Sequence, residues 1–580
     1  MRPHHRTTAI VFALVAVVFG VFFRTLESGF LRWDDDINVF ENPHVQGLTA
    51  ENLRWMFTDF EQAIRYKPLS WLAWALVHEV FGLNPFGYHL ANVLLHCTNT
   101  VLVFLLIRRL LEWGTRNGER VTEDNARADI CAALGALLWA VHPLRVEPVA
   151  WVTGLPYGLA LFFALVATLL YLRANAPAAD AATRRRDYWL SVTAFALAVF
   201  SYPIVLGFVA ALVALDFFPL RRLGVANMSL TSVVRDKLPF LALSLLLVAG
   251  TVYGRFHVTG SWDKPVTLDN FPPFARAMQT FFLWAYYAWK PLLPLDLCPV
   301  YPVLMESKFN EPIFLLSALG VLGVSGWLWV KRNAWPAAFA LWLAHLGLLV
   351  PMLGLTERPH YPHDRYAIIN GVLWAIAGAA VLCKLARSRL KPAPAPVLAG
   401  GVAVAALFAA MSWRQTAVWH SDLPFFTDMA AKLRSPHYRS QALLKLGNAH
   451  ADAEDDARAI AAYHEALQLS PASATFHLYF NLGNALARQG QWAEAVPAFE
   501  AALRLKPDHA SAHRAMGHAL ASLKNLPRAL DHLNRAVQLA PNNAAAHAQL
   551  AEVLEQLGRS DQARFHMAEA ERLKTLARPQ

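Results

Sequence analysis

Residues 155–172 read LPYGLALFFALVATLLYL, eighteen consecutive positions without a charged side chain. An α-helix needs a run of about this length and polarity to cross the hydrocarbon core of a bilayer. The chain before residue 420 repeats this pattern, with long apolar runs separated by short polar turns. We expect eleven spans, at residues 8–23, 86–107, 129–141, 155–172, 188–201, 203–218, 237–253, 312–330, 335–353, 366–384 and 397–413.

The composition of the 580-residue chain supports a membrane protein. Hydrophobic residues make up 56% and charged residues 16% of the sequence, whereas about 25% of the residues of ordinary soluble domains are charged. The mean hydropathy is +0.31. This balance argues against a water-soluble protein. The four cysteines are too few and too scattered for a disulfide framework or a CxxC metal site.

The formal net charge of +10 indicates either affinity for nucleic acid or the cytoplasmic side of a membrane protein. Basic residues collect in alternate turns, from Arg2 and Arg6 before the first span to Lys384 and Arg387 after the tenth. This distribution follows the positive-inside rule. It predicts a cytoplasmic N-terminus and places the chain after residue 413 on the opposite face, which is the periplasm if the membrane is a bacterial inner membrane. The alternation holds only if the apolar segment 273–293 lies at the interface without spanning.

A repeat of 34 to 36 residues begins after residue 436. Three series of small residues keep the same phase: Gly447, Gly483, Gly517 and Ala551; Ala459, Ala495, Ala529 and Ala563; Ala466, Ala502, Ala536 and Ala570. This spacing is typical of the tetratricopeptide repeat. We expect four copies, at about 437–471, 472–507, 508–541 and 542–575, after a linker at 421–436. Such arrays present a concave surface that binds peptides or proteins; alternatively, the array is a spacer or a dimerisation surface. Its nearly balanced charge argues against nucleic-acid binding.

The first outer loop, at residues 24–85, contains the most distinctive polar segment. Asp34, Asp35 and Asp36 are adjacent, and three neighbouring carboxylates repel one another unless a cation or hydrogen-bond donors neutralise them. Such a group suits a general base or a metal site. The alternative interpretation is a solvated acidic turn that caps a helix.

Two further polar segments lie where apolar runs end. His142, Arg145 and Glu147 follow the third span, and residues 357–366 (ERPHYPHDRY) precede the tenth. Arginine offers a planar fork that matches phosphate oxygens, so these groups suit a phosphate head group at the bilayer edge. The alternative is interfacial anchoring by long polar side chains.

Five segments jointly carry a family resemblance. They are WDDDINVFENPHV (33–45), YKPLSW (66–71), FGLNPFGYHLANVLLH (81–96), HPLRVEPVAWV (142–152) and DRYAI (364–368). Together with the repeats that follow, they resemble the transmembrane and tetratricopeptide-repeat-containing O-mannosyltransferases and their bacterial relatives. The resemblance implies an all-α GT-C glycosyltransferase bundle at residues 1–420, followed by an α-solenoid. It also implies a polyprenyl-phosphate sugar donor, with transfer on the extracytoplasmic side.

The resemblance also implies roles for individual residues. Asp34 and Asp35 match the family's acidic pair, and one of them would take the proton of an acceptor hydroxyl during an inverting displacement. A protein Ser or Thr presented by the repeats is the expected acceptor. A divalent cation at Asp34, Asp35 and Asp36 stays open. The expected groups around the donor phosphate are Arg365, His142, Arg145, Glu147, Asp364, Tyr366 and His363.

Two departures from the family pattern favour a different function. Residues 153–158 read TGLPYG, where animal members typically show a GRAxLL-like run and other bacterial members an ERKD-like run. Ser201 and Tyr202 replace the family's usual Lys-Glu. Two charged groups are therefore missing. The alternative function is a non-enzymatic membrane-anchored scaffold whose repeats recruit envelope or secreted-protein partners.

Overall fold

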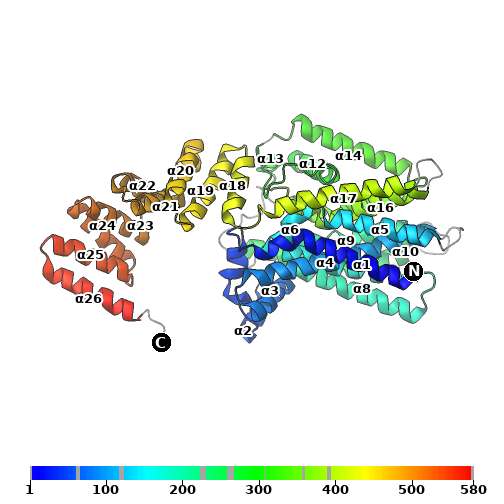
Figure 1. Cartoon of the computed structure of the whole chain (residues 1–580), viewed down its shortest axis with the longest axis horizontal. Helices are drawn as coiled ribbons and strands as arrows, with labels where there is room; N and C mark the ends of the chain where they lie inside the picture. Colours follow the sequence, from blue (N-terminus) through cyan, green and yellow to red (C-terminus); the bar gives the residue numbers. More distant parts are fainter. Residues whose placement is uncertain are drawn as a thin grey trace. The chain divides into compact units, whose positions relative to one another are not determined.

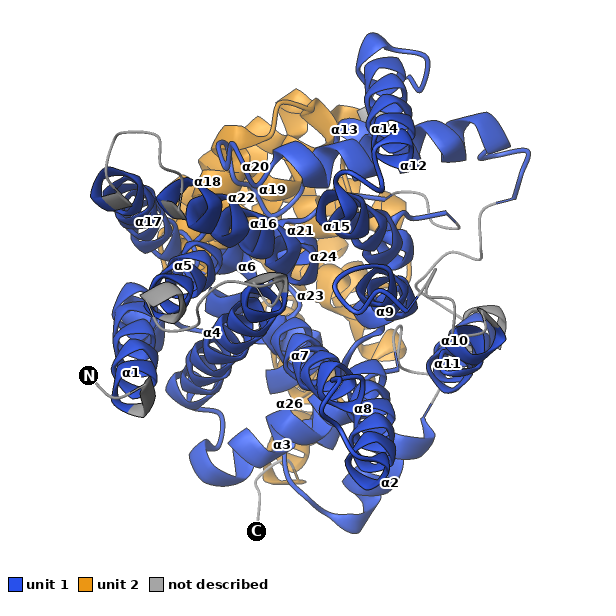
Figure 2. Cartoon of the chain, turned by 90° about the vertical axis from the view of Figure 1, so that its right-hand side faces the viewer, with its two compact units in different colours: residues 1–421 blue, residues 422–580 orange. Residues whose placement is uncertain are grey.

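Helices and turns make up the whole of the described chain. The computed structural model describes residues 3–59, 66–115, 123–222, 230–257, 267–306, 308–355, 360–387 and 394–576, and within these ranges there is no β-strand. The expected all-α class is confirmed. The chain divides into two compact units, residues 1–421 and residues 422–580, which are coloured separately in Figure 2.

The first unit is a bundle of long apolar helices (Figure 1). Its longer helices are α1 (Pro3–Phe22), α4 (Pro85–Thr115), α5 (Glu123–Ala140), α7 (Leu155–Ala174), α8 (Ala181–Ser201), α11 (Leu238–His257), α14 (Pro312–Val330), α16 (Ala367–Arg387) and α17 (Pro394–Thr416). Two shorter ones, α9 (Phe208–Phe217) and α15 (Pro336–Leu348), complete the bundle. Proline at the first position of α4, α14 and α15 begins these helices without the loss of an internal hydrogen bond.

Each of the eleven expected spans coincides with a helix. Among the described residues, six segments are long and apolar enough to cross a membrane: His5–Glu27, Pro85–Trp113, Val152–Ala174, Pro312–Val330, Asp364–Ala386 and Ala395–Thr416. The bent pair Ala126–Ala140 and Pro143–Ala150 makes a seventh if it is one span. The helices over 203–217, 238–253 and 336–352 are apolar but shorter, and α8 carries three arginines and Asp187 near its start. The chain is an integral membrane protein, while the number of crossings and their direction remain predictions.

A sharp bend follows α5 and creates the buried turn that the candidate site uses. The helix axis changes direction by 60° between Ala126–Ala140 and Pro143–Ala150. Pro143 lacks an amide hydrogen and clashes with a continuing helix, which explains the break. The chain then forms three short helices, η4 (Pro143–Arg145), α6 (Val146–Ala150) and η5 (Val152–Gly154), before α7 begins. Every residue of these three short helices is buried.

Shorter elements complete the first unit. The first loop contains η1 (Phe23–Glu27), η2 (Asp36–Phe40), η3 (Pro43–Val45), α2 (Ala50–Thr58) and α3 (Pro68–Phe81). Elsewhere lie η6 (Pro203–Val205), α10 (Leu230–Arg235), α12 (Pro273–Trp289), α13 (Val303–Glu306), η7 (Val350–Met352) and η8 (Asp364–Tyr366). In Figure 2, which looks along α4, α5 and α7, helices α3 and α12 run across the view. This orientation of α12 suits the interfacial position expected for residues 273–293.

The first loop is folded around a small core of its own. Val39, Val45 and Met56 from the loop pack with Trp74 of α3 and Tyr88 of α4, and all five side chains are buried. Burial of this aromatic and aliphatic surface holds the loop against the ends of the helices. The acidic segment 34–36 is therefore fixed to a packed scaffold.

The second unit consists of α18 (Asp422–Lys432) and four helix pairs. The segment expected as a linker, 421–436, contains α18, which packs against α19. The pairs are α19 (Pro436–Asp452) with α20 (Asp456–Leu469), α21 (Phe476–Arg488) with α22 (Trp492–Leu505), α23 (Ala510–Ser522) with α24 (Leu526–Leu539) and α25 (Ala544–Gln556) with α26 (Ser560–Leu576); η9 (Pro471–Ser473) links the first two pairs. Each pair coincides with one expected repeat.

The repeated glycines explain how the helices of a pair pack. A Cβ atom added at Gly483 would lie 2.6 Å from the ring of Phe499, and one added at Gly517 would lie 2.6 Å from Leu533. Gly447 faces Tyr463 in the same way. The small residue on the first helix therefore makes room for the large one on the second. This explains why a small residue recurs at the same position of these repeats.

A substitution at one of these contacts tests the packing. We expect Gly483→Ala to destabilise the second unit by about 1–3 kcal/mol, because the buried ring of Phe499 must shift to accommodate the methyl group. Gly400→Ala in α17 is the matched control, since a Cβ there meets no atom within 4 Å. Chemical unfolding of the full chain in detergent measures both. Equal stability of the two variants would show that the glycine contact does not limit packing.

Candidate active site

Three sequence motifs that lie far apart in the chain meet at one end of the bundle. The indole Nε1 of Trp151 donates a hydrogen bond to the carbonyl oxygen of Trp33 at 2.9 Å. The guanidinium of Arg365 forms an ion pair with Glu147. Segments 33–36, 142–154 and 363–366 are thereby joined. These are the segments from which the sequence predicted the catalytic and donor-binding groups.

Asp35 anchors the acidic segment to the turn before α7. Its Oδ1 accepts hydrogen bonds from the amide of Thr153 at 2.9 Å and from the Thr153 hydroxyl at 2.6 Å. Its Oδ2 accepts from the amide of Leu31 at 2.9 Å. The side chain is buried, and burial raises the pKa of Asp35 to about 7, against the lowering effect of these hydrogen bonds. Asp35 therefore fixes the position of the loop.

Asp34 differs from its neighbour in both backbone and exposure. It is exposed and has a φ of 74°, a left-handed conformation that aspartate adopts more readily than most residues. Its carbonyl oxygen accepts from the Asn38 amide at 3.1 Å and from Asn38 Nδ2 at 2.8 Å. Of the expected acidic pair, Asp34 is the member whose side chain is accessible to a substrate.

Arg365 and Glu147 form the buried centre of the site. Glu147 Oε2 also accepts the backbone amide of Arg365 at 2.8 Å, so both carboxylate oxygens are used. Arg365 Nε donates to the Tyr157 hydroxyl at 2.9 Å, and its guanidinium carbon lies 5.2 Å from the centre of the Trp151 ring. The Tyr157 hydroxyl lies 3.0 Å from that of Tyr202. These contacts together fix the position of the buried Arg365 guanidinium.

Arg145 is a second buried arginine, with a different environment. Its side chain lies 5.7 Å from the centre of the Trp139 ring, and a Cβ at Gly371 would come within 2.7 Å of its Nη2. Within the described part of the chain, its Nε and Nη1 have no hydrogen-bond partner. A buried donor without an acceptor is costly. Arg145 is therefore the guanidinium at this site that has bonds to offer an anion.

The other expected donor-binding residues have mainly structural partners. His142 Nδ1 accepts the Leu144 amide at 3.2 Å, which leaves its Nε2 to donate to the Pro291 carbonyl at 2.8 Å. His142 thus caps η4 with Nδ1 and ties this turn to the segment after α12 with Nε2. Asp364 accepts from the Tyr301 hydroxyl at 3.0 and 3.2 Å. Burial raises the pKa of that tyrosine well above its ordinary range, so it remains a donor.

His363 and Tyr366 surround the guanidinium of Arg365. His363 Nδ1 lies 2.8 Å from the Pro299 carbonyl oxygen and 3.0 Å from Arg365 Nη1. The ring of Tyr366 has its centre 5.4 Å from the Arg365 guanidinium carbon. Both side chains are buried. They pack against the guanidinium that pairs with Glu147, so the DRY segment lies at the ion pair.

The residues that the sequence interpretation missed stand where the chain departs from the family. Thr153 supplies two of the three hydrogen bonds to Asp35, and Tyr157 and Tyr202 bond to each other beside Arg365. In the sequence, these positions were noted only because the family's usual charged residues are missing there. Hydroxyl-bearing residues next to apolar runs were the sequence feature that could have identified them as site residues.

The acidic triad does not fit a cation site. In the described ranges, no cluster of three or more His, Cys, Asp or Glu side chains is arranged to hold a metal ion. The Asp35 oxygens face N–H and O–H donors, whose hydrogens occupy the lone pairs that a cation would need. We therefore assign no chemical step to a metal at Asp34, Asp35 and Asp36.

The role of Asp35 can be tested through stability. We expect Asp35→Asn to lower the free energy of unfolding by about 1–3 kcal/mol, because an amide group cannot accept all three hydrogen bonds. The buried carboxyl has a raised pKa, so its contribution is greatest below pH about 4 and is lost as the pH rises through about 7. The stability difference between native and variant protein should therefore shrink over this interval. Thermal unfolding at several pH values measures it, with exposed Asp34→Asn as the control; a difference independent of pH contradicts the assignment.

The comparisons with known proteins place this geometry in context. Tetratricopeptide-repeat models match residues 441–473, 480–544 and 520–574. Protein O-mannosyl-transferase Tmtc1 of Drosophila melanogaster is 35% identical over 157 residues, which are 26% of this chain and 16% of that protein. Human TMTC4 is 26% identical over 321 residues, covering 50% of this chain and 42% of TMTC4. Human TMTC3 is 24% identical over 344 residues, or 54% of this chain and 35% of TMTC3.

These matches span less than half of the relatives' own length. Among solved structures, a crystal structure of MamA has a TM-score of 0.24 and 19% identity, covering 26% of this chain and 85% of MamA. The repeats predicted from the spacing of small residues are confirmed by the repeat models. The chain is thus an integral membrane protein with tetratricopeptide repeats, homologous to the protein O-mannosyl-transferases of the TMTC type.

Proposed function

We propose that the first unit is a GT-C-type glycosyltransferase that moves a sugar, mannose by analogy with its relatives, from a polyprenyl phosphate to a protein Ser or Thr on the extracytoplasmic side. The observation that carries the proposal is the meeting of segments 33–36, 142–154 and 363–366 around a buried ion pair. A protein that serves only as a membrane anchor does not need buried charges, because burying a charge in the membrane costs free energy. Relatives named as O-mannosyl-transferases share this part of the sequence.

Asp34 is the proposed general base. Its exposed carboxylate takes the proton of the acceptor hydroxyl while that oxygen forms a bond to the anomeric carbon of the sugar. The bond between the anomeric carbon and the phosphate oxygen breaks at the same time, and the lipid phosphate leaves with the bonding electrons. Direct displacement inverts the anomeric centre. Asp35 holds the neighbouring Asp34 in place through its bonds to Thr153 and Leu31.

The two arginines have different roles in this scheme. Arg365 is neutralised by Glu147 and bonded to Tyr157, so it positions the motifs around it. Arg145 has two guanidinium nitrogens, Nε and Nη1, without partners in the described structure and is the group that best fits the charge of the leaving phosphate. Such a charge-assisted bond forms in a water-poor site, where it is stronger than in water.

The scaffold alternative is supported by the missing family charges at 153–158 and at 201–202. However, the residues that replace them are used in the site: Thr153 binds Asp35, and Tyr157 and Tyr202 bond beside Arg365. This use of the replaced positions supports the enzyme over the scaffold. In the proposed function, the repeats present the protein acceptor, which follows from the usual use of such arrays.

A transfer assay tests the proposal. Membranes that contain the protein receive radiolabelled polyprenyl-phosphate mannose and an acceptor peptide, and labelled peptide is counted. We expect Asp34→Asn to lower the rate at least 100-fold, the typical effect of removing a general base. Glu41→Gln, another exposed carboxylate of the same loop, should keep the native rate. The proposal fails if native membranes transfer no sugar, or if Asp34→Asn is as active as the control.

The ion pair permits a second test. We expect Glu147→Gln to destabilise the first unit by about 3–5 kcal/mol, because it leaves the Arg365 guanidinium buried without its counter-charge. The double variant Glu147→Gln and Arg365→Met removes both charges and should recover part of the stability without recovering transfer. Thermal unfolding and the transfer assay on the three proteins distinguish positioning from mere folding. If the double variant is no more stable than Glu147→Gln, the pair does not hold the site together.

A further inference from the structure

Two histidine pairs occupy equivalent positions in the third and fourth repeats. His513 on α23 faces His532 on α24, with their Nδ1 atoms 3.0 Å apart. His547 on α25 faces His566 on α26, with their Nδ1 atoms 2.9 Å apart. The second pair lies 34 residues after the first, so both pairs stand at one phase of the repeat. In Figure 1 these four helices form the end of the array that precedes the C-terminus.

The hydrogen positions in each pair follow from a third contact. His513 Nε2 lies 2.8 Å from the Pro507 carbonyl oxygen, and His547 Nε2 lies 3.0 Å from the Pro541 carbonyl oxygen. A carbonyl oxygen only accepts, so each Nε2 carries the hydrogen, and the Nδ1 of the same neutral ring is then an acceptor. The facing ring on the second helix therefore donates from its own Nδ1. Each pair thus links the preceding loop to both helices of its repeat.

The four rings of these pairs are largely withdrawn from water. His547 is 5% exposed, and His513, His532 and His566 are half-buried. Burial lowers the pKa of His532 and of His566, and the facing ring lowers it further. Each pair therefore favours the state in which its two rings are not both charged.

Charged groups near the pairs do not offset this effect. They are His509, Glu500, Arg528 and Asp531 around the third-repeat pair, and Glu569, Arg559 and Asp561 around the fourth-repeat pair. Arg528 is paired with Glu500 at 2.8 Å. Glu569 is paired with Arg572 at 2.5 Å. The carboxylates of Asp531 and Glu569 favour a protonated ring, but burial and the facing histidine outweigh them.

The first and second repeats carry other residues at the positions of the pair. In the first repeat these are Leu443 and Ala462, and in the second they are Tyr479 and Ala498. None of these side chains changes its charge between about pH 5 and 8, whereas histidine does. A contact that responds to acid is therefore confined to one half of the array, and the other half serves as an internal reference.

Protons affect such a pair in two steps. The first proton binds the Nε2 of the second-helix ring, and the hydrogen bond between the rings survives because its donor is now charged. The second proton can bind only the acceptor Nδ1 of the first-helix ring. Both facing nitrogens then carry a hydrogen and both rings carry a positive charge, so the rings repel each other at the observed separation. Double protonation therefore breaks the contact.

We propose that the third and fourth repeats form an acid-sensitive half of the array, in which double protonation of each histidine pair opens the packing between the two helices of its repeat. The first and second repeats keep their packing under the same conditions. Because α23 and α25 pack against each other, the opening also changes the concave surface that such arrays use for binding. The proposal concerns the array alone and does not depend on sugar transfer.

The direction of the pH dependence follows from proton binding in the closed and open states. A histidine in an open repeat has a pKa of about 6.5, whereas the closed pair resists its second proton. The open state therefore binds more protons below about pH 6.5, so stability that is present above this pH is lost as the pH falls. One extra proton for each pair changes the opening equilibrium about tenfold per pH unit.

Backbone hydrogen exchange, read by mass spectrometry on the full-length protein in detergent, tests the proposal. Amides of α23 to α26 are compared with those of α19 to α22 at about pH 7.5 and about pH 5, after correction for the intrinsic exchange rate. We expect protection to fall at least about tenfold in α23 to α26 and to stay within about twofold in α19 to α22. An equal loss of protection in both halves overturns the proposal.

Replacing one pair by its counterpart in the second repeat gives a matched variant. The double substitution His513→Tyr and His532→Ala places in the third repeat the residue types of Tyr479 and Ala498. We expect the pH dependence to disappear from α23 and α24 and to remain in α25 and α26. His464→Ala, which removes an exposed histidine of α20, is the control and should keep the native pH dependence throughout. Unchanged pH dependence of α23 and α24 in the double variant contradicts the proposal.

Titration of the individual rings keeps the proposal testable if the double variant does not fold. Hydrogen exchange at the C2 position of each imidazole, followed by mass spectrometry of the native protein, reports its protonation. We expect His532 and His566 to become protonated at a lower pH than the exposed His464, because burial and the facing ring oppose their charge. A common midpoint for the three rings would refute the proposal.

Discussion

The ion pair between Glu147 and Arg365 is the interaction on which the candidate site depends. It joins residues 218 positions apart in sequence and ties the break after α5 to the start of α16. In a water-poor environment neither charge is tolerable alone, so each fixes the other. The Glu147 carboxylate reaches the Arg365 amide from α6, which follows the bend at Pro143 and the short helix η4. The bend, the ion pair and the short helices therefore depend on one another.

Trp151 connects the acidic segment 33–36 of the first loop to this ion pair. Its indole donates to Trp33 while its ring lies 5.2 Å from the Arg365 guanidinium carbon. Two residues later, Thr153 holds Asp35. A single turn of chain thus contacts both the acidic segment and the ion pair. This arrangement explains why Asp35 is buried while the adjacent Asp34, with its left-handed backbone, is exposed.

Much of this architecture could be predicted from the sequence, because its causes are local. Apolar runs predict helices, Gly447 and Gly483 recur opposite large residues, and proline marks helix starts. The grouping of motifs followed from the family resemblance. The difference in burial between Asp34 and Asp35 could not be predicted, since it depends on which carboxylate bonds Thr153 in three dimensions. The same holds for His142, whose Nδ1 caps η4 while its Nε2 bonds the Pro291 carbonyl.

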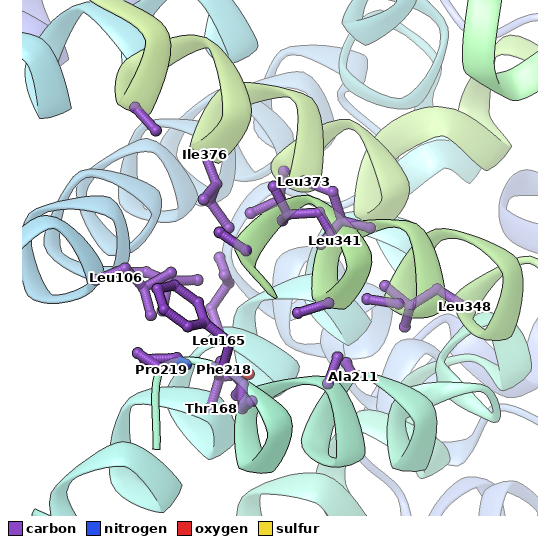
Figure 3. A pocket seen from close by; sticks show the side chains of 18 of the residues that line it. Leu106, Leu165, Thr168, Ala211, Phe218, Pro219, Leu341, Leu348, Leu373 and Ile376 are labelled. Carbon is purple, nitrogen blue, oxygen red and sulfur yellow. The ribbon is translucent and has the colours of Figure 1, made fainter. Parts of the chain in front are cut away.

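An apolar cavity of about 580 Å³ between α4, α7, α9, α15 and α16 was also beyond the reach of the sequence (Figure 3). Protein interiors rarely leave a void larger than a water molecule, because each empty volume forfeits dispersion contacts. Selection for stability alone would replace alanine by leucine at positions such as Ala340 and Ala344. Small residues there, on α15, leave part of the volume between these helices unfilled.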